Sequence, residues 1–306
     1  MPQNKSVIKR AISADGSVRV LFCDSTAIVR EAGEIHHTSK TMTAALGRAL
    51  TATSLMSSLL KDKDNSLTLQ FKGDGPAGSI VCVGDYMGNV RGYADDPSVE
   101  LPPNQYGKLD VGGAVGRGSM YVIKDMGMNE PYVGVSNIVS GEIAEDITEY
   151  FANSEQTPSV CALGVRVNQE NKAYAAGGYL VQLMPGYEDE VVDRLEANIT
   201  VMESVSKLIA DGKDGDEIIS LIFDGIEYEM FDEFDIEYRC TCSRDKYLRA
   251  LIGLSEDDMN ELKKSDEPVE TNCRFCGKKY VFELSELEEA RAAAKNAAAE
   301  EVSDEE

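Results

Sequence analysis

The sequence contains no tryptophan, only two histidines and only seven cysteines among its 306 residues. It also lacks a run of about 18 apolar residues that could cross a membrane, and its basic start, MPQNKSVIKR, is not followed by the apolar core of a secretory signal. An odd and small number of cysteines does not suit a secreted scaffold held by disulfides, so reduced thiols are expected. These absences predict a soluble, cytoplasmic protein with no membrane partner.

Basic residues are scarce as well, since 30 Lys and Arg stand against 54 Asp and Glu, a formal net charge of −24. Nucleic-acid binding requires clustered Lys and Arg, because they replace the counterions of the phosphates. No such cluster interrupts the acidity for more than a few residues. Nucleic acid is therefore not an expected partner, and the charge is explained by solubility.

Catalytic motifs are missing too. The chain has no G-x-S-x-G, H-E-x-x-H or Walker sequence. The adjacent His36 and His37 have no nearby cysteine or motif that would make them ligands or members of a catalytic triad. The sequence predicts that the protein is not an enzyme.

What is present begins with a strand-rich region, residues 1–182. It mixes short alternating apolar runs such as SLTLQF and SIVCV with glycine-rich turns and one helical run, SKTMTAALGRALTATSLMSSLLKD. This pattern predicts a large α+β core domain. The remaining length leaves room for smaller elements after it.

An acidic segment follows the break at Pro185 and Gly186. Its apolar residues recur at intervals of three and four, which predicts one amphipathic helix from Val191 to Ile209, ended by DGKDG. Between Gly186 and Arg239 there are 17 acidic and 4 basic residues, a net charge of −13. We therefore predict a helical acidic linker over residues 183–237 that is docked weakly, because carboxylate repulsion opposes the packing of its apolar stripe; an ordinary core helix is the alternative. The stripe consists of Val191, Leu195, Ile199 and Met202.

Four of the seven cysteines form two close pairs near the end of the chain. Cys240 and Cys242 are spaced C-x-C, and Cys273 and Cys276 are spaced C-x-x-C. Residues i and i+2 of an extended segment point to one face, and a C-x-x-C turn likewise aims two sulfurs at one point. Each pair thus offers half of a tetrahedral four-sulfur site, which suits zinc.

The segment around these pairs, residues 238–284, is too short to fill a core of its own, so a metal is expected to hold it together. Two short helices between the pairs are expected to begin after the N-caps Ser243 and Ser255 and to bring the pairs face to face. We predict a four-cysteine zinc domain with one Zn²⁺ per chain over residues 238–284, followed by an acidic helical tail over 285–306. The isolated Cys23, Cys82 and Cys161 are predicted to be buried, small apolar residues.

Such a site also has chemistry of its own. Four thiolates around one zinc ion carry net negative charge and are open to oxidants such as peroxide. Oxidation to disulfides would release the metal and with it about 10 kcal/mol or more of folding free energy, judged from zinc-finger peptides. The sequence therefore predicts local unfolding on oxidation.

Several segments together carry a resemblance to a known family. They are CTCS at 240–243, CRFCGKKYVF at 273–282, GEIAEDITEYFANSEQTPSVCALGV at 141–165, AGGYLVQLMPG at 176–186 and FKGDGPAGSIVCVGDYMGNVRGYADDP at 71–97. They span nearly the whole chain, the acidic tail excepted. The chain resembles the bacterial redox-regulated 33 kDa heat shock chaperonin family.

The resemblance implies an ATP-independent chaperone, a holdase that binds unfolding proteins under oxidative stress. The reduced, zinc-bound form would be inactive. Oxidation would form a disulfide within each close pair, release zinc, unfold the linker and produce a homodimer, with residues 1–182 binding clients and forming the dimer. The resemblance assigns the zinc ligands to Cys240, Cys242, Cys273 and Cys276.

Two other classes stay open on the residues alone. A C-x-x-C motif also serves thiol-disulfide oxidoreductases, but there it begins a helix that follows a strand in a βαβ context. A zinc-ribbon module that binds protein or nucleic acid is the second alternative, and the net charge argues against nucleic acid. Neither class explains a long acidic linker beside clustered thiols.

Overall fold

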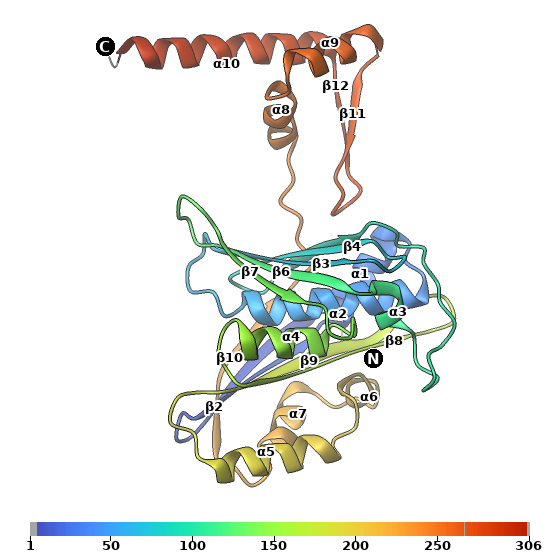
Figure 1. Ribbon diagram of the computed structural model, residues 1–306, viewed down its shortest axis with the longest axis vertical. Helices are drawn as coiled ribbons and strands as arrows, with labels where there is room; N and C mark the ends of the chain where they lie inside the picture. The colour runs from blue at the N-terminus through green and yellow to red at the C-terminus, as the bar shows by residue number, and fades with distance from the viewer. Residues whose placement is uncertain (1–4, 266, 305–306) are drawn as a thin grey trace. The chain divides into compact units, whose positions relative to one another are not determined.

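The computed structural model describes residues 5–265 and 267–304, and the chain divides into two compact units at the bond between Arg239 and Cys240. The first unit contains two five-stranded antiparallel sheets with helices around them, and the second contains helices and one two-stranded hairpin (Figure 1). The α+β class predicted from the sequence is confirmed. None of the helices in these two described ranges is long and apolar enough to cross a membrane.

One sheet of the first unit has the strand order β10-β1-β2-β9-β8. Neighbouring strands are antiparallel, with Val18 of β2 opposite Leu183 of β9. The two faces of β2 are both buried, because helices cover this sheet on both sides. The strands are β1 (Ser6–Ser13), β2 (Val18–Asp24), β8 (Ser159–Val167), β9 (Ala173–Leu183) and β10 (Tyr228–Ile236).

The other sheet has the order β5-β4-β3-β6-β7. Its strands alternate in burial, as in β3, where Leu67, Leu69 and Phe71 are buried and the residues between them are partly exposed. This alternation is typical of an antiparallel sheet with one covered face. The strands are β3 (Ser66–Gly73), β4 (Ser79–Asp85), β5 (Val90–Ala94), β6 (Gly118–Asp125) and β7 (Tyr132–Asn137).

Helix α2 (Lys40–Ser57) lies between the two sheets, and all but two of its 18 residues are buried. Close packing requires small residues here, since a Cβ atom at Gly47 would lie 2.6 Å from the side chain of Val29. Buried hydroxyls are satisfied within the helix, for example by Thr51 donating to the Gly47 carbonyl at 2.7 Å. Three further helices pack beside α2 or its flanking strands: α1 (Thr26–His36), α3 (Val111–Val115) and α4 (Ala144–Asn153).

The acidic segment packs on the face of the first sheet that points away from α2. It forms α5 (Asp189–Val201), α6 (Val205–Ala210) and α7 (Gly215–Ile222) before it returns as β10. These helices cover a separate core cluster on β1, β2 and β9, which includes Val18, Val20, Phe22, Tyr179 and Val181. We call this sheet surface the linker-covered face.

The stripe residues of the segment all contact this cluster. Leu195 is 4% exposed, and Val191, Ile199 and Met202 are partly buried against it. A stripe with one deeply buried member and three partly buried ones gives a shallow contact surface. The carboxylates of Asp189 and Glu190, at the start of α5, oppose the packing of this stripe on the sheet.

Between Val191 and Ile209 the segment contains two helices where the sequence predicts one. The main chain is extended at Met202 and Ser204, with ψ of 141° and 140°, which ends α5 and starts α6. Helix α6 lies directly on the sheet, because a Cβ atom at Gly164 of β8 would be 2.7 Å from Ser206. The prediction of a single helix is wrong because the apolar residues of α5 and those of α6 follow different parts of the sheet.

Strand β10 pairs with β1 in an antiparallel ladder at the edge of the sheet, and ion pairs add to this contact. Lys9 is buried, and its ammonium lies 2.8 Å from the carboxylate of Asp216 on α7 and 3.3 Å from that of Glu233 on β10. Arg10 lies 3.3 Å from Asp232 of the same strand. Part of the negative charge of the acidic segment is therefore neutralised by basic residues of β1.

The second unit has a small core of four buried side chains, Met259, Tyr280, Phe282 and Leu287. Its helices begin where the sequence predicts: Ser243 accepts from the Lys246 N–H at 3.3 Å, and Ser255 accepts from the Asp258 N–H at 3.1 Å. The elements are α8 (Arg244–Ile252), α9 (Glu256–Ser265), β11 (Val269–Asn272), β12 (Lys279–Phe282) and α10 (Leu284–Asp304).

Candidate metal centre

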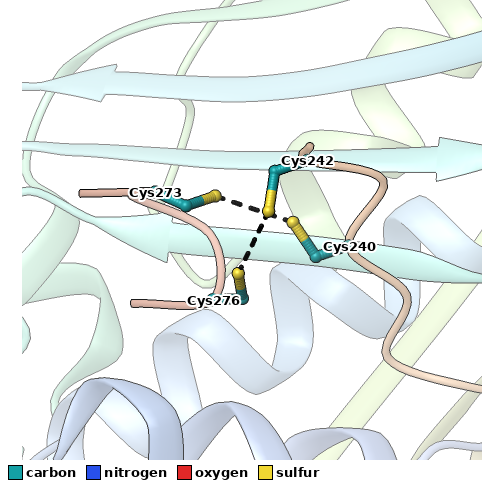
Figure 2. A group of neighbouring side chains, drawn as sticks. All are labelled: Cys240, Cys242, Cys273 and Cys276. Atoms are coloured by element: carbon teal, nitrogen blue, oxygen red, sulfur yellow. Dashed lines mark hydrogen bonds between the residues drawn. The ribbon is translucent and has the colours of Figure 1, made fainter. Parts of the chain in front are cut away.

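The four paired cysteines converge in the second unit. Cys240 and Cys242 lie on the irregular segment before α8, while Cys273 and Cys276 lie on the turn between β11 and β12. Their four sulfur atoms all lie within 4.8 Å of one another, and Figure 2 shows them pointing toward a common centre. The structure thus brings together the four residues that the sequence singles out as ligands.

The sulfur spacing fits a four-coordinate metal ion. With metal–sulfur bonds of about 2.3 Å, the edges of a regular tetrahedron are about 3.8 Å long. The measured separations are 3.6 Å between the Cys240 and Cys273 sulfurs and 3.5 Å between those of Cys242 and Cys276. Both short contacts join one close pair to the other, so a single ion at the centre would link the two ends of the segment. Soft thiolates select ions such as zinc over magnesium or calcium.

The turn that carries Cys273 and Cys276 is tightly hydrogen-bonded. The Cys273 N–H donates to the Lys278 carbonyl at 2.9 Å, and the Gly277 N–H donates to the Cys273 carbonyl at 2.8 Å. Gly277 has φ of +69°, a conformation that glycine adopts without strain. This turn aims main-chain N–H groups of Phe275 and Cys276 at the Cys273 sulfur. Such donors stabilise a thiolate.

Two tyrosines that the sequence analysis did not single out contact the sulfurs. The Tyr280 hydroxyl lies 3.1 Å from the Cys242 sulfur, and the Tyr247 hydroxyl bonds to the sulfur of Cys273. Their rings stack at 5.0 Å between centroids. The available signal was the alternation of β12, which places Tyr280 on the buried side of the hairpin. These hydroxyls can orient the sulfurs and spread the negative charge of a thiolate centre.

The thiols of Cys240, Cys273 and Cys276 differ in acidity. Burial acts to raise the pKa of Cys273, but hydrogen bonds from main-chain N–H groups and from Tyr247 outweigh it and lower the pKa to about 7. Burial raises the pKa of Cys240 to about 12, and it also raises the pKa of Cys276. Of these three thiols, that of Cys273 therefore loses its proton most readily.

Other contacts hold the elements of the centre in place. The Arg244 guanidinium lies 4.4 Å from the centre of the Phe282 ring and forms an ion pair with Glu286. Arg291 of α10 donates to the Leu254 carbonyl at 2.9 Å. Helix α10 thus braces both α8 and the loop that leads into α9.

The remaining cysteines stand apart from the centre. Cys23, Cys82 and Cys161 are all buried in the first unit, as the sequence predicts. Burial raises the pKa of Cys161 to about 12 and raises those of Cys23 and Cys82 as well. These thiols are poor nucleophiles and poor ligands, because both roles require the thiolate.

A two-sheet α+β domain followed by a small unit with four converging thiols defines a two-part protein whose C-terminal module could hold a metal ion. A family model described as "Hsp33 protein" matches residues 6–283, which includes both parts. The chain belongs to the Hsp33 family.

Curated relatives and a solved structure agree with this assignment. The 33 kDa chaperonin of Ruminiclostridium cellulolyticum is 44% identical over 281 residues, covering 92% of this chain and 96% of the relative. The 33 kDa chaperonin of Clostridioides difficile is 42% identical over 284 residues, covering 92% and 97%. The crystal structure of the 33 kDa chaperonin of Thermotoga maritima matches with a TM-score of 0.87 at 35% identity, covering 96% of this chain and 100% of that one.

We predict that Cys273→Ser weakens Zn²⁺ binding by more than about 100-fold, since a lost ligand should cost more than a lost supporting hydrogen bond. The second unit should lose part of its structure, because its core is small. Zinc content after competition with a chelating dye measures the first effect, and circular dichroism measures the second. Cys161→Ala, which removes a thiol outside the centre, is the control. A full equivalent of tightly held zinc in Cys273→Ser would show that this residue is not a ligand.

A second prediction concerns the hydroxyl that contacts Cys242. Tyr280→Phe keeps the stacked ring but removes the donor, so zinc should still bind with one equivalent but about 10-fold more weakly. The change should be visible in chelator competition while the fold, followed by circular dichroism, is unaltered. Tyr106, which is 75% exposed, supplies the matched control Tyr106→Phe. Equal affinity of Tyr280→Phe and the unaltered protein would mean that the hydroxyl only fills space.

Proposed function

We propose that the protein is a redox-regulated, ATP-independent chaperone, a holdase that binds unfolding proteins in the cytoplasm during oxidative stress. The observation that carries the proposal is the convergence of four thiols in a unit whose own core is small. Membership of the Hsp33 family supports the chaperone activity. The thiol centre supports control by oxidation.

In the reduced protein, Cys240, Cys242, Cys273 and Cys276 would hold one Zn²⁺ ion. Zinc in such a site cross-links the chain and has no redox chemistry of its own. The thiolates are the reactive groups, and the sulfurs of Cys240, Cys242 and Cys276 belong to residues that are only partly buried. An oxidant in solution can therefore reach the centre.

Oxidation would convert each close pair into a disulfide. One thiolate attacks peroxide to give a sulfenic acid and hydroxide, and the second thiolate of the pair then displaces hydroxide to form the S–S bond. Each thiolate pair thus gives up two electrons as its disulfide forms, and these electrons reduce one peroxide molecule. Sulfurs joined in this way no longer act as thiolate ligands, so zinc leaves and the second unit loses its cross-link.

The C-x-C pair directly follows the linker in the sequence, so formation of its disulfide would affect the linker. The Cα atoms of extended residues i and i+2 are about 6.5 to 7 Å apart, at the upper limit for a disulfide. Joining Cys240 to Cys242 therefore bends the main chain at Thr241. Only three residues separate Cys240 from the end of β10 at Ile236.

The linker segment is suited to release. The net charge of −13 between Gly186 and Arg239 opposes its compaction, while its apolar stripe and the ion pairs of β10 hold it on the sheet. Release would expose Val18, Val20 and Val181 of the linker-covered face, which are buried in this structure. Such an apolar surface on residues 1–182 could bind clients and support a homodimer.

The alternatives have less support. The C-x-x-C motif lies in a hairpin turn between β11 and β12, whereas an oxidoreductase places it at the start of a helix. A zinc-ribbon module that only binds a partner would have no use for an acidic segment packed over an apolar sheet face. Nucleic acid is disfavoured by the net charge of −24.

Three measurements on one sample test the proposal. Treating the zinc-loaded protein with peroxide should release one equivalent of zinc, consume four thiols and switch on suppression of aggregation of guanidinium-unfolded citrate synthase. Reductant should reverse the thiol loss. Zinc release and thiol loss without any suppression would rule out the redox-controlled holdase, and suppression that is equal before and after peroxide would rule out the control by oxidation.

We also predict that Leu195→Ser combined with Ile199→Ser releases the linker and gives aggregation suppression in reductant, with zinc still bound. Each buried apolar side chain contributes about 1.5–3 kcal/mol to the docking, so losing two should exceed what a marginal segment can tolerate. Hydrogen exchange over residues 183–237 should accelerate. Val201→Ser on the same helix is the control, because Val201 is 83% exposed. Fast exchange without activity would mean that release of the linker is not the switch.

A further inference from the structure

Exposed apolar side chains gather on one hairpin of the first unit. Large hydrophobic residues that are exposed concentrate between residues 126 and 139, on β7 and on the loop that joins it to β6. Figure 1 shows this hairpin in green, extending past the neighbouring strands. The members are Met126, Met128, Tyr132, Val133, Val135 and Val139, of which Val133, Val135 and Val139 are 50%, 52% and 61% exposed. We call this group the β7 edge patch.

The strand presents unpaired main-chain groups as well as side chains. β7 is the last strand of its sheet and pairs, in the described part of the chain, with β6 alone. The Ile138 N–H donates to the Gly118 carbonyl of β6. Because hydrogen-bonded pairs alternate along an antiparallel ladder, residues 132, 134 and 136 bond to β6. The N–H and C=O groups of Val133 and Val135 therefore point to the free edge.

Nothing within the strand protects this edge. Natural edge strands carry charged side chains, proline or bulges that prevent pairing with another chain. β7 (YVGVSN) has none of these, and its register with β6 is regular. Between Met126 and Val139 there is one charged residue, Glu130, in a chain with 54 acidic residues. By contrast, β10, an edge strand of the other sheet, is rich in carboxylates (YEMFDEFDI).

We propose that the β7 edge captures extended apolar segments of unfolding polypeptides by pairing with them as an added strand. Main-chain hydrogen bonds to Val133 and Val135 would give affinity without sequence specificity, and their side chains would contact alternate apolar residues of the client. The inference rests on the proposed holdase function and names the surface and the kind of segment that it binds.

A second copy of this chain fits the edge less well. A strand of six residues is about 20 Å long and about 10 Å wide, so pairing two copies would bury about 400 Å² in total, against more than about 1,000 Å² for a stable interface. Two chains with a charge of −24 each also repel one another, and the nearly neutral patch offers no compensating pairs. An apolar, weakly charged segment is not repelled in this way, and brief capture of such a segment does not need the area of a stable interface.

The test uses the oxidised full-length protein with Val133→Lys and Val135→Lys combined. The probe is a fluorescein-labelled Thr-Val-Thr-Val-Thr-Val peptide, together with the same peptide methylated on alternate amide nitrogens. We expect the double variant to bind the peptide about tenfold more weakly, because edge lysines block added strands. The unaltered protein should bind the methylated peptide with a similar loss, because one row of its hydrogen bonds is missing. Tyr106→Lys and Tyr174→Lys, at positions 75% and 46% exposed, should bind as the unaltered protein does.

Val133→Thr combined with Val135→Thr keeps β-branched side chains, so it provides a test if the lysine variant misfolds. The threonine variant should weaken peptide binding measurably, but less than the lysine variant does. Unchanged peptide affinity in the lysine variant would overturn the proposal, as would equal binding of the methylated peptide. Loss of the oxidised dimer in sedimentation with peptide affinity intact would assign the edge to a second copy instead. If the unaltered oxidised protein failed to suppress citrate synthase aggregation while the edge still bound the peptide, the holdase function would fail and the edge site would stand.

Discussion

Under the proposed function, the stability of the C-terminal unit would depend on whether its four thiols are held together. Only Met259, Tyr280, Phe282 and Leu287 form its buried core among the described residues, which is small for a unit that begins at Cys240 and continues through α10. Partly buried apolar side chains, among them Leu248, Leu251 and Leu262, pack against this core, and the Tyr280 hydroxyl connects it to Cys242. A bound ion would fix two distant stretches of chain at one point. Its loss would remove the constraint from all of them together.

The segment before this unit is balanced in a different way. Helices α5 to α7 bury Leu195, Leu208 and Ile222 on the sheet, yet the same segment concentrates more than half of the net charge of the chain. Ion pairs from Lys5, Lys9 and Arg10 to β10 offset part of this repulsion, although the exposed pair between Lys5 and Asp235 contributes little. Under the proposed function, a change at Cys240 would reach this segment at its end, which lies four residues away at Ile236.

Local signals in the sequence predicted the centre better than they predicted the linker. Cysteine spacing and the caps Ser243 and Ser255 act over a few residues, and the structure contains both caps where predicted. β10 was missed because acidic residues occupy both of its faces, and its pairing depends on Lys9 and Arg10 more than 200 residues earlier. The break between α5 and α6 was missed because it follows the shape of the sheet beneath, with close contacts at Gly164, and not a proline or glycine in the helix.

The β7 edge is exposed while the linker is still docked, which raises the question of why the reduced protein would not act as a chaperone. One edge of six residues makes few contacts, so it binds and releases a segment quickly. The linker-covered face would add a second surface on the same unit once the segment leaves it. A client that reaches both surfaces is retained far more strongly than by either, because the second contact is intramolecular. In this view the edge samples unfolding chains in both states, and oxidation converts brief capture into retention.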